Sequence, residues 1–406
     1  MMSLLARALV SGSLPPIYVQ RNGGHSGSNW ASELLATKGW SVYFQFGGLC
    51  DGEPDVGHPT PSPGQASAAL TATWARGCGC GGARVFSCNA ENQPRCKQNV
   101  PFCDRAKCPM AACRAGGGVA VVAAPLGEQG TSALDLAFTA RPDARLVTWT
   151  RLNSVKHTLS QAKAGCSCVA LTNHGTDEDR EAGRNRPCFV HIPAELLLHK
   201  AARQTAKAAQ FVSADVVGGV PVAHRLFYEE VRLDPAAAMK GLLRALNATP
   251  TRRQLAGPSI PTAIQKLTSD DLSSVLLDFA AADEAFGAWP CLRKHLHHRS
   301  DRVETCEAEA ARMEAGAADA GRRRERVNEL TLAAQTVAGN SSQPYTLACE
   351  PNSTRHGARH VLCAAAEHKR MALLGSAGPV DVCLTAGWHS SPVSHGADWI
   401  GGRVTG

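Results

Sequence analysis

The apolar positions of the chain fall into short runs separated by glycine-rich or polar segments, and the first of these runs is the most informative. A short apolar run begins at Ile17, behind two prolines, and predicts a buried strand. The segment RNGGHSGSN follows, and apolar residues then recur at helical spacing from Trp30 until Gly39. Strand, glycine loop and helix in this order direct backbone N–H groups and the positive end of a helix at one point. The pattern therefore predicts a phosphate-binding loop.

The same periodicities predict further elements downstream. They favour a strand or buried loop over 40–46, strands over 117–125, 145–150 and 222–227, and helices over 193–210, from 235, and over 266–279. The helix from 235 has Asp234 as its N-cap and Pro235 at its first position, and its apolar stripe is expected in the core. The last helix has Thr268 or Ser269 as its cap.

A second informative segment follows the predicted strand at 145–150. Arg151 stands at the end of this strand, Asn153 comes next, and the following helix carries Ser154 and Ser160. A planar, bidentate cation together with a hydroxyl group and a helix N-terminus is a set that binds a dianionic phosphate. Taken alone, an ordinary surface arginine and a helix serine fit this segment as well.

These segments resemble, in order, the motifs of sulfotransferases that use 3′-phosphoadenosine 5′-phosphosulfate (PAPS), above all the carbohydrate-type enzymes and their bacterial relatives. The loop His25-Ser26-Gly27-Ser28-Asn29-Trp30 is similar to the family's [KR]-S-G-[ST]-[ST]-W/L, with His25 and Asn29 as departures. The segment Tyr228-Glu229-Glu230-Val231, followed by Asp234-Pro235, resembles the family's Y-E-D-L-x-x-D-P element. The resemblance implies an α/β fold with a P-loop-like, three-layer α/β/α core and a parallel sheet.

The resemblance also implies roles for particular residues. Those that it assigns to the 5′-phosphosulfate are Gly24, His25, Ser26, Gly27, Ser28 and Asn29. Arg151 and Ser160 are assigned to the 3′-phosphate, with Ser154 as the alternative serine. The catalytic base that takes the acceptor's proton is expected to be Glu53, with Asp51 as the neighbour to test beside it.

His25 occupies the position at which the family has lysine or arginine, and this leaves three interpretations open. His25 acts as a catalytic proton donor to the leaving group, Arg21 supplies the missing charge, or the site is degenerate and the protein inactive. Two alternatives to an active sulfotransferase follow: a secreted binding protein that keeps the fold without the chemistry, and a P-loop-type small-molecule kinase. The absence of G-x-x-x-x-G-K-[ST] from the sequence disfavours the kinase.

Charge and cysteine content narrow the partners and the compartment. With 42 Lys and Arg against 35 Asp and Glu, the formal charge of +7 suits an anionic nucleotide but is too mild and scattered to indicate nucleic acid. No apolar run reaches the roughly 20 residues of a membrane span, so no membrane anchor is seen. Eight of the 16 cysteines lie between Cys50 and Cys113, at spacings that favour disulfides over zinc, and no metal is expected. Together with glycosylation sequons at Asn247, Asn340 and Asn352, they favour the secretory pathway, in particular the Golgi lumen, over the cytoplasm.

The chain is predicted to hold one sulfotransferase-like α/β domain over 15–295, with a cysteine-rich insertion over 50–115. Residues 296–406 are predicted to form a helical segment and then an irregular tail of low order. The resemblance implies in-line transfer of a sulfuryl group from PAPS to an acceptor hydroxyl, which is expected to belong to a carbohydrate.

Overall fold

The computed structural model of the 406-residue chain places part of the sequence. It describes residues 14–44, 85–87, 119–123, 134, 138–139, 141–163, 166, 188–248, 271–297, 304–315, 325–330, 332–333, 336, 345–350, 357–374 and 378–385. The chain separates into two compact units. We call residues 1–150, 211–262 and 396–406 the first unit, and residues 151–210 and 263–395 the second unit.

The first unit is built on a seven-stranded sheet with the strand order β3-β2-β4-β1-β5-β8-β7. The strands are β1 (Ile17–Arg21), β2 (Ser41–Phe44), β3 (Val85–Ser87), β4 (Val119–Ala123), β5 (Arg145–Thr150), β7 (Val216–Val217) and β8 (Val220–Phe227). All neighbouring strands are parallel except β7, which pairs antiparallel with the first two residues of β8. The predicted α/β fold with a parallel sheet is therefore confirmed.

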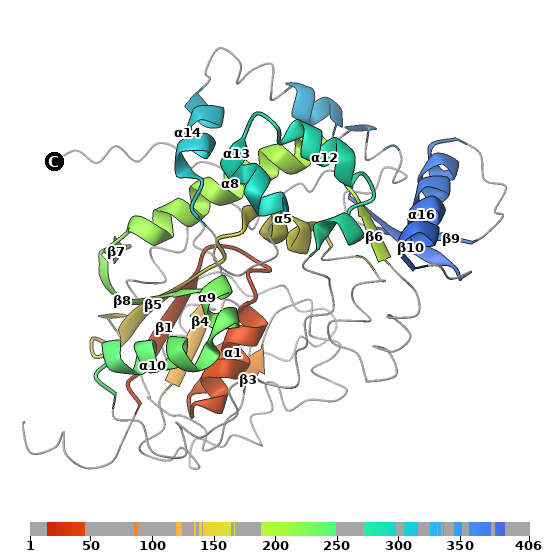
Figure 1. Ribbon diagram of the computed structural model, residues 1–406. Helices are drawn as coiled ribbons and strands as arrows, with labels where there is room; N and C mark the ends of the chain where they lie inside the picture. The colour runs from red at the N-terminus through yellow and green to blue at the C-terminus, as the bar shows by residue number, and fades with distance from the viewer. Residues whose placement is uncertain are drawn as a thin grey trace, which may run out of the picture. The chain divides into compact units, whose positions relative to one another are not determined.

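Three helices cover one face of this sheet, as Figure 1 shows: α1 (Ser28–Thr37), α9 (Tyr228–Leu233) and α10 (Pro235–Ala245). Local signals set their ends. Asp234 Oδ1 accepts a hydrogen bond from the backbone N–H of Ala237 (2.8 Å) at the start of α10, as the sequence predicts. Gly39, with φ at +101°, follows the end of α1 as a left-handed cap. The buried stripe of α10 joins the core that α1 and the central strands share.

The second unit combines helices with a three-stranded sheet. Its helices are α5 (Ser154–Ala162), α8 (Ala194–Ser213), α12 (Phe279–Ala285), α13 (Pro290–His297), α14 (Glu307–Ala315) and α16 (Ala358–Leu374). In its sheet, β10 (Val380–Leu384) lies between β6 (Cys188–His191), to which it is parallel, and β9 (Tyr345–Cys349), to which it is antiparallel. Among the described residues, no helix combines the length and apolar character needed to cross a bilayer.

The described part of 296–406 differs from the irregular tail that the sequence predicted. Strand β10 is buried at all five positions, and it forms an apolar core with β9, with α16 and with Phe189 of β6. A buried strand of this kind carries no alternating pattern, and its partner β6 lies almost 200 residues earlier in the chain. The order of these segments therefore comes from pairing between residues distant in the sequence.

Disulfides of the second unit join segments that lie either far apart or close together in the sequence. The pairs are Cys166–Cys383, Cys291–Cys306 and Cys349–Cys363. The prediction of disulfides rather than zinc concerned other cysteines, those of the insertion, and stays a prediction. The cysteine-rich insertion, from Cys50 to Cys113, lies outside the described residues, and the domain boundaries at 15–295 and 296–406 stay a prediction.

Candidate functional site

The predicted phosphate-binding loop lies between β1 and α1, at the carboxyl end of a central strand. Strand β1 is buried along its whole length, between the parallel strands β4 and β5. The loop turns with left-handed backbone at His25 (φ +60°) and Gly27 (φ +86°). The first helical hydrogen bond of α1 runs from Ala31 N–H to Gly27 O (3.1 Å), so the amides just before it belong to the start of the helix and point out of it.

A trio of aromatic rings holds this loop in shape. Trp30 of α1, Trp149 of β5 and Tyr228 of α9 pack edge to face, with ring centroids 5.7–6.3 Å apart. Trp149 Nε1 donates a hydrogen bond to Ser26 O (2.9 Å), which fixes the loop backbone to the sheet. The Tyr228 ring lies so close to Gly27 that a Cβ there would come within 2.5 Å of it. Glycine is therefore required at this position for space as well as for its backbone angles.

A buried positive charge lies at the end of β1, where the loop begins. Arg21, the last residue of β1, is 4% exposed, and its Nη1 donates a hydrogen bond to Ser28 Oγ (2.9 Å) at the start of α1. Burial lowers the pKa of Arg21 to about 10, which leaves the guanidinium charged at neutral pH. His25, in contrast, is exposed, and Ser26 is fully buried, with no hydrogen-bond partner for its Oγ among the described residues. The charge that the loop itself holds in place is therefore that of Arg21.

In the second unit, the turn before α5 carries the residues predicted to hold the 3′-phosphate. Arg151 follows the last residue of β5 and is 7% exposed. Asn153 is the N-cap of α5, because its Oδ1 accepts a hydrogen bond from Lys156 N–H (2.8 Å). Ser160 lies in the last turn of α5 and is half-buried, whereas the alternative residue Ser154 is fully buried at the first helical position.

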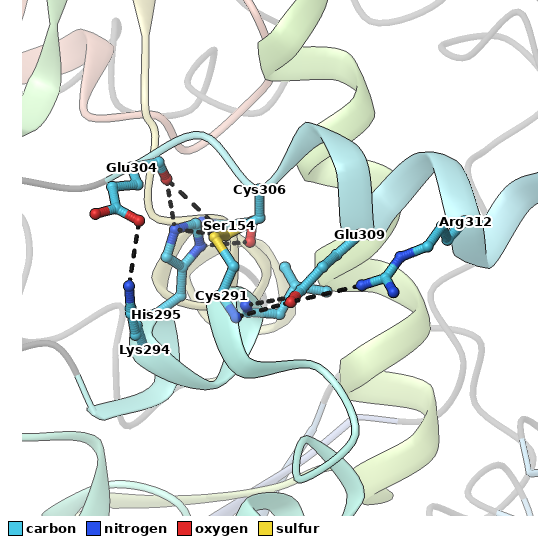
Figure 2. The surroundings of a disulfide bond; sticks show 9 residues. Ser154, Cys291, Lys294, His295, Glu304, Cys306, Glu309 and Arg312 are labelled. Carbon is cyan, nitrogen blue, oxygen red and sulfur yellow. Dashed lines mark hydrogen bonds and ion pairs between the residues drawn. A yellow bond between two sulfur atoms is a disulfide. The ribbon is translucent and has the colours of Figure 1, made fainter.

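His295 of α13 fixes this turn, as Figure 2 shows for Ser154. The backbone N–H of Ser154 donates to His295 Nδ1 (3.3 Å), and Ser154 Oγ also lies 3.0 Å from it. Asn153 Nδ2 donates to the backbone oxygen of His295 (3.0 Å). Since Nδ1 accepts, the ring hydrogen is assigned to Nε2, which lies 2.9 Å from Glu304 O. The buried imidazole is thus satisfied at both nitrogens as a neutral ring.

The Cys291–Cys306 disulfide closes the chain around this histidine (Figure 2). Cys291, His295 and Cys306 place their side-chain ligand atoms within 4.8 Å of one another, which is close enough for a metal ion. A zinc ion would need two thiolates and a ring-nitrogen lone pair. Here the sulfurs are joined, and His295 Nε2 faces a carbonyl oxygen instead. In the described arrangement a disulfide closes the chain beside His295, and the three side chains do not fit a metal ion.

The structure places the predicted site residues that it describes in two groups. The loop residues from Gly24 to Asn29 lie together in the first unit, and Arg151 and Ser160 lie in the second unit. Glu53 and Asp51, the candidates for the catalytic base, are outside the described residues.

Sequence reasoning missed several residues that support these groups. They are Trp149, Lys163 and His295. A tryptophan in the predicted strand and a histidine after a predicted domain end carry no local signal of such a role. A lysine at the end of a helix is usually predicted to be a solvent-exposed cap. Lys163 is buried instead, with 7% of its surface exposed.

Comparisons with known proteins add little. No family model matches the chain, and no curated protein matches it. Among solved structures, a sulfotransferase from Alicyclobacillus acidocaldarius is 15% identical over 70% of this chain and 96% of its own, with a TM-score of 0.28. The sulfotransferase domain from the curacin biosynthetic pathway is 13% identical over 75% and 92%, with a TM-score of 0.27. The sulfotransferase domain of the Synechococcus PCC 7002 olefin synthase is 13% identical over 75% and 95%, with a TM-score of 0.29. TM-scores this low carry no argument about activity.

Proposed function

We propose that the protein is a PAPS-dependent sulfotransferase that transfers a sulfuryl group to an acceptor hydroxyl, with a carbohydrate as the acceptor. The observation that carries the proposal is the loop between β1 and α1, where a buried guanidinium, helix-start amides and a glycine-dependent turn meet at the carboxyl end of a central parallel strand. In open α/β sheets, anionic ligands bind at this end of the strands. The loop motif and the Arg151 segment, in that order along the chain, point to a nucleotide with two separate phosphate groups.

The residues present suit such a donor. Arg21 and the backbone amides from Gly24 to Asn29 would bind the 5′-phosphosulfate, and Arg151 with Ser160 would bind the 3′-phosphate. In the reaction, the acceptor oxygen forms a bond to sulfur while the bond between sulfur and the phosphate oxygen breaks. The acceptor's proton passes to the base, for which Glu53 is the candidate, and 3′,5′-adenosine bisphosphate leaves. Cations around the phosphate stabilise the charge that develops on the leaving group.

The compartment belongs to the same proposal. The disulfides of the second unit favour an oxidising environment, and we propose the secretory pathway, with the Golgi lumen as the site of carbohydrate sulfation. Asn247, the first residue of one glycosylation sequon, is exposed at the end of α10 and is therefore accessible to modification.

The test is calorimetric titration of the purified protein with 3′,5′-adenosine bisphosphate, with ATP and Mg²⁺ as the competing ligand. We expect tighter binding of the bisphosphate, and a loss of about 10- to 100-fold in affinity for Arg151→Ala, the usual effect of removing a charge-assisted contact. Arg145→Ala is the matched control, because Arg145 is exposed at the other end of β5. An equal effect of the two substitutions would argue against the assigned site.

The same titration separates the alternatives. Equal or tighter binding of ATP, with transfer of phosphate that depends on Mg²⁺, would favour the small-molecule kinase. Binding of the bisphosphate without sulfation of any carbohydrate acceptor offered with PAPS would favour an inactive binding protein that keeps the fold.

A further inference from the structure

Three disulfides join described cysteines of the second unit, and they differ in their exposure to solvent. Two of them join cysteines that are all 8% exposed or less, namely Cys166–Cys383 and Cys349–Cys363. In the third pair, Cys306 is buried, whereas Cys291 is only partly buried in the first turn of α13. Thiol–disulfide exchange begins when a thiolate reaches one sulfur of a disulfide. Among these pairs, Cys291 is therefore the residue at which such an attack starts.

Two neighbouring groups make the sulfurs of this pair unequal, as Figure 2 shows. Cys306 Sγ lies 3.4 Å from Nε2 of the buried His295, the ring nitrogen that carries the hydrogen. Glu309 instead lies beside Cys291, because its carboxylate accepts hydrogen bonds from the backbone N–H groups of Cys291 (2.9 Å) and Leu292 (3.0 Å). A ring N–H stabilises a thiolate, and a nearby carboxylate opposes one. When the disulfide opens, negative charge is therefore favoured on Cys306.

We propose that Cys291–Cys306 is a redox-active pair that a dithiol, the reactive group of thiol–disulfide oxidoreductases, opens reversibly. A thiolate of the dithiol attacks Cys291 Sγ, the S–S bond breaks, and its electron pair stays on Cys306 as a thiolate. The second thiol of the reagent resolves the mixed disulfide, so the dithiol becomes a disulfide and gives up two electrons and two protons. One proton is taken up by Cys291 and the other by His295, which pairs as an imidazolium with the Cys306 thiolate.

The proton on His295 transmits the redox state to the turn before α5. In the disulfide form, His295 Nδ1 accepts a hydrogen bond from Ser154 N–H (3.3 Å). An imidazolium has hydrogen on both nitrogens, so Nδ1 becomes a donor, and Ser154 Oγ lies 3.0 Å away as its acceptor. The backbone N–H of Ser154 then loses this partner, and reduction loosens the start of α5, which Asn153 caps. That the adjacent Arg151 binds a phosphate group there rests on the proposed function.

The first experiment measures how readily each described pair is reduced. The purified protein is equilibrated with mixtures of reduced and oxidised dithiothreitol, with EDTA to keep metal ions from the freed thiols. Alkylation of free thiols and mass spectrometry of the peptides then report each disulfide. We expect Cys291–Cys306 to open at a ratio of reduced to oxidised reagent at least about tenfold lower than the two buried pairs, or about 30 mV for a two-electron couple. Equal ratios, or earlier opening of a buried pair, would overturn the proposal.

His295→Ala separates stabilisation of the thiolate from a merely structural role of the ring. Without the imidazole, we expect Cys291–Cys306 to need a ratio about tenfold higher than in the unmodified protein, because its reduced form is less stable. Loss of packing alone would act in the opposite direction, since a loosened segment holds the two sulfurs together less well. An unchanged or lower ratio would therefore overturn the role of His295.

Two further variants complete this comparison. His297→Ala is the matched control on the same helix, and we expect it to leave the ratio unchanged. An equal rise in this control would overturn the role of His295. If His295→Ala does not fold, His295→Gln decides by the same criterion, because glutamine offers the Ser154 amide an acceptor but cannot carry the proton.

A matched pair of variants, Cys291→Ser and Cys306→Ser, tests the link to the turn. Both lose the disulfide, but only Cys291→Ser keeps a sulfur beside His295. Amide hydrogen exchange in the peptide that contains Ser154 should be about fivefold faster in Cys291→Ser, the effect of one lost hydrogen bond. The unmodified protein, reduced at a ratio that opens only this pair, should show the same acceleration relative to its disulfide form. Equal rates in both comparisons would overturn the link.

The reduction ratios and the exchange rates involve no nucleotide, so their outcome is separate from that of the proposed function. A protein that fails to bind 3′,5′-adenosine bisphosphate but shows both effects would contradict the proposed function and support the redox-active pair. A protein that binds the bisphosphate but shows neither effect would do the reverse.

Discussion

Substitution of Gly27 by alanine tests whether the loop before α1 is held as tightly as its contacts indicate. Two features of the structure oppose a side chain here. The backbone at Gly27 is left-handed, with φ at +86°. A Cβ atom would also lie 2.5 Å from both Cδ2 and Cε2 of Tyr228. The ring has little freedom to move away, since Trp30 and Trp149 pack against it edge to face.

The two features contribute separately to the expected loss of stability. A non-glycine residue in the left-handed region costs roughly 1–2 kcal/mol. Forcing a methyl group against a held ring costs about 1–3 kcal/mol, the usual range for overpacking. Gly27→Ala should therefore lower the free energy of unfolding by about 2–5 kcal/mol. In a Tyr228→Ala background the second contribution disappears, so the two substitutions should couple by about 1–3 kcal/mol.

Urea unfolding followed by circular dichroism measures all four corners of this cycle. Gly24→Ala is the matched control in the same loop, because nothing lies within 4 Å of a Cβ at that position and its φ is not left-handed. We expect it to change stability by less than about 0.5 kcal/mol. If Gly27→Ala and Tyr228→Ala instead add to within about 0.5 kcal/mol, the ring does not shape the loop and the reasoning is wrong.

Two further predictions concern the second unit. The folded-state pKa of Lys163, about 7, lies below its ordinary 10.5, so the unfolded state binds more protons between these values and stability rises with pH across this window. Lys163→Met should remove this rise of stability with pH, which amounts to about 3–5 kcal/mol in total. The thermal midpoints of the unmodified protein and of Lys163→Met should therefore differ most near pH 7 and converge toward pH 10. Midpoints that run parallel across this range would contradict the prediction. His295→Ala should lower the free energy of unfolding in urea by about 2–4 kcal/mol, because it leaves a cavity and the buried Ser154 amide without its acceptor. His297→Ala removes a half-exposed contact with Asp283 and an edge-to-face ring contact with Phe279, so it should change the free energy of unfolding by about 1 kcal/mol or less. Equal losses in the two variants would refute a special role for His295.

The elements that could be predicted from the sequence are those whose signals are local. The strand at 145–150 was expected with the bounds it has, because a short β-rich run meets a turn at both ends. The start of α10 followed from Asp234 and Pro235, a cap and a first residue that act within one turn. The loop before α1 was recognised in the same way, from glycines and small polar residues between an apolar run and a helical pattern.

Elements that depend on distant pairing could not be predicted. A single helix was expected over 266–279, but within the described residues Asp271 caps only a short 3-10 turn, Leu272–Ser274, and α12 begins at Phe279. The reason is β6: Val190 accepts a hydrogen bond from Leu277 N–H (2.8 Å) and donates one to Val275 O (2.8 Å). These bonds hold the backbone extended where the local sequence favours a helix. The support of the candidate site escaped prediction for the same reason, since Trp149 reaches Ser26 across 123 residues.

The geometry of the loop bears on which residue replaces the lysine or arginine that stands at position 25 in the sulfotransferases the chain resembles. His25 follows the motif in sequence, but its side chain is exposed and its backbone is left-handed. Arg21 lies four residues earlier, yet its guanidinium is buried and bonded to Ser28, the first residue of α1. A buried charge held by a hydroxyl at a helix start interacts with an anion more strongly than an exposed imidazole, which water screens. The burial that lowers the pKa of Arg21 to about 10 has a cost in the free protein, and a bound anion would offset it. Of the three interpretations that the sequence left open, substitution of the missing charge by Arg21 is therefore the one that the geometry favours.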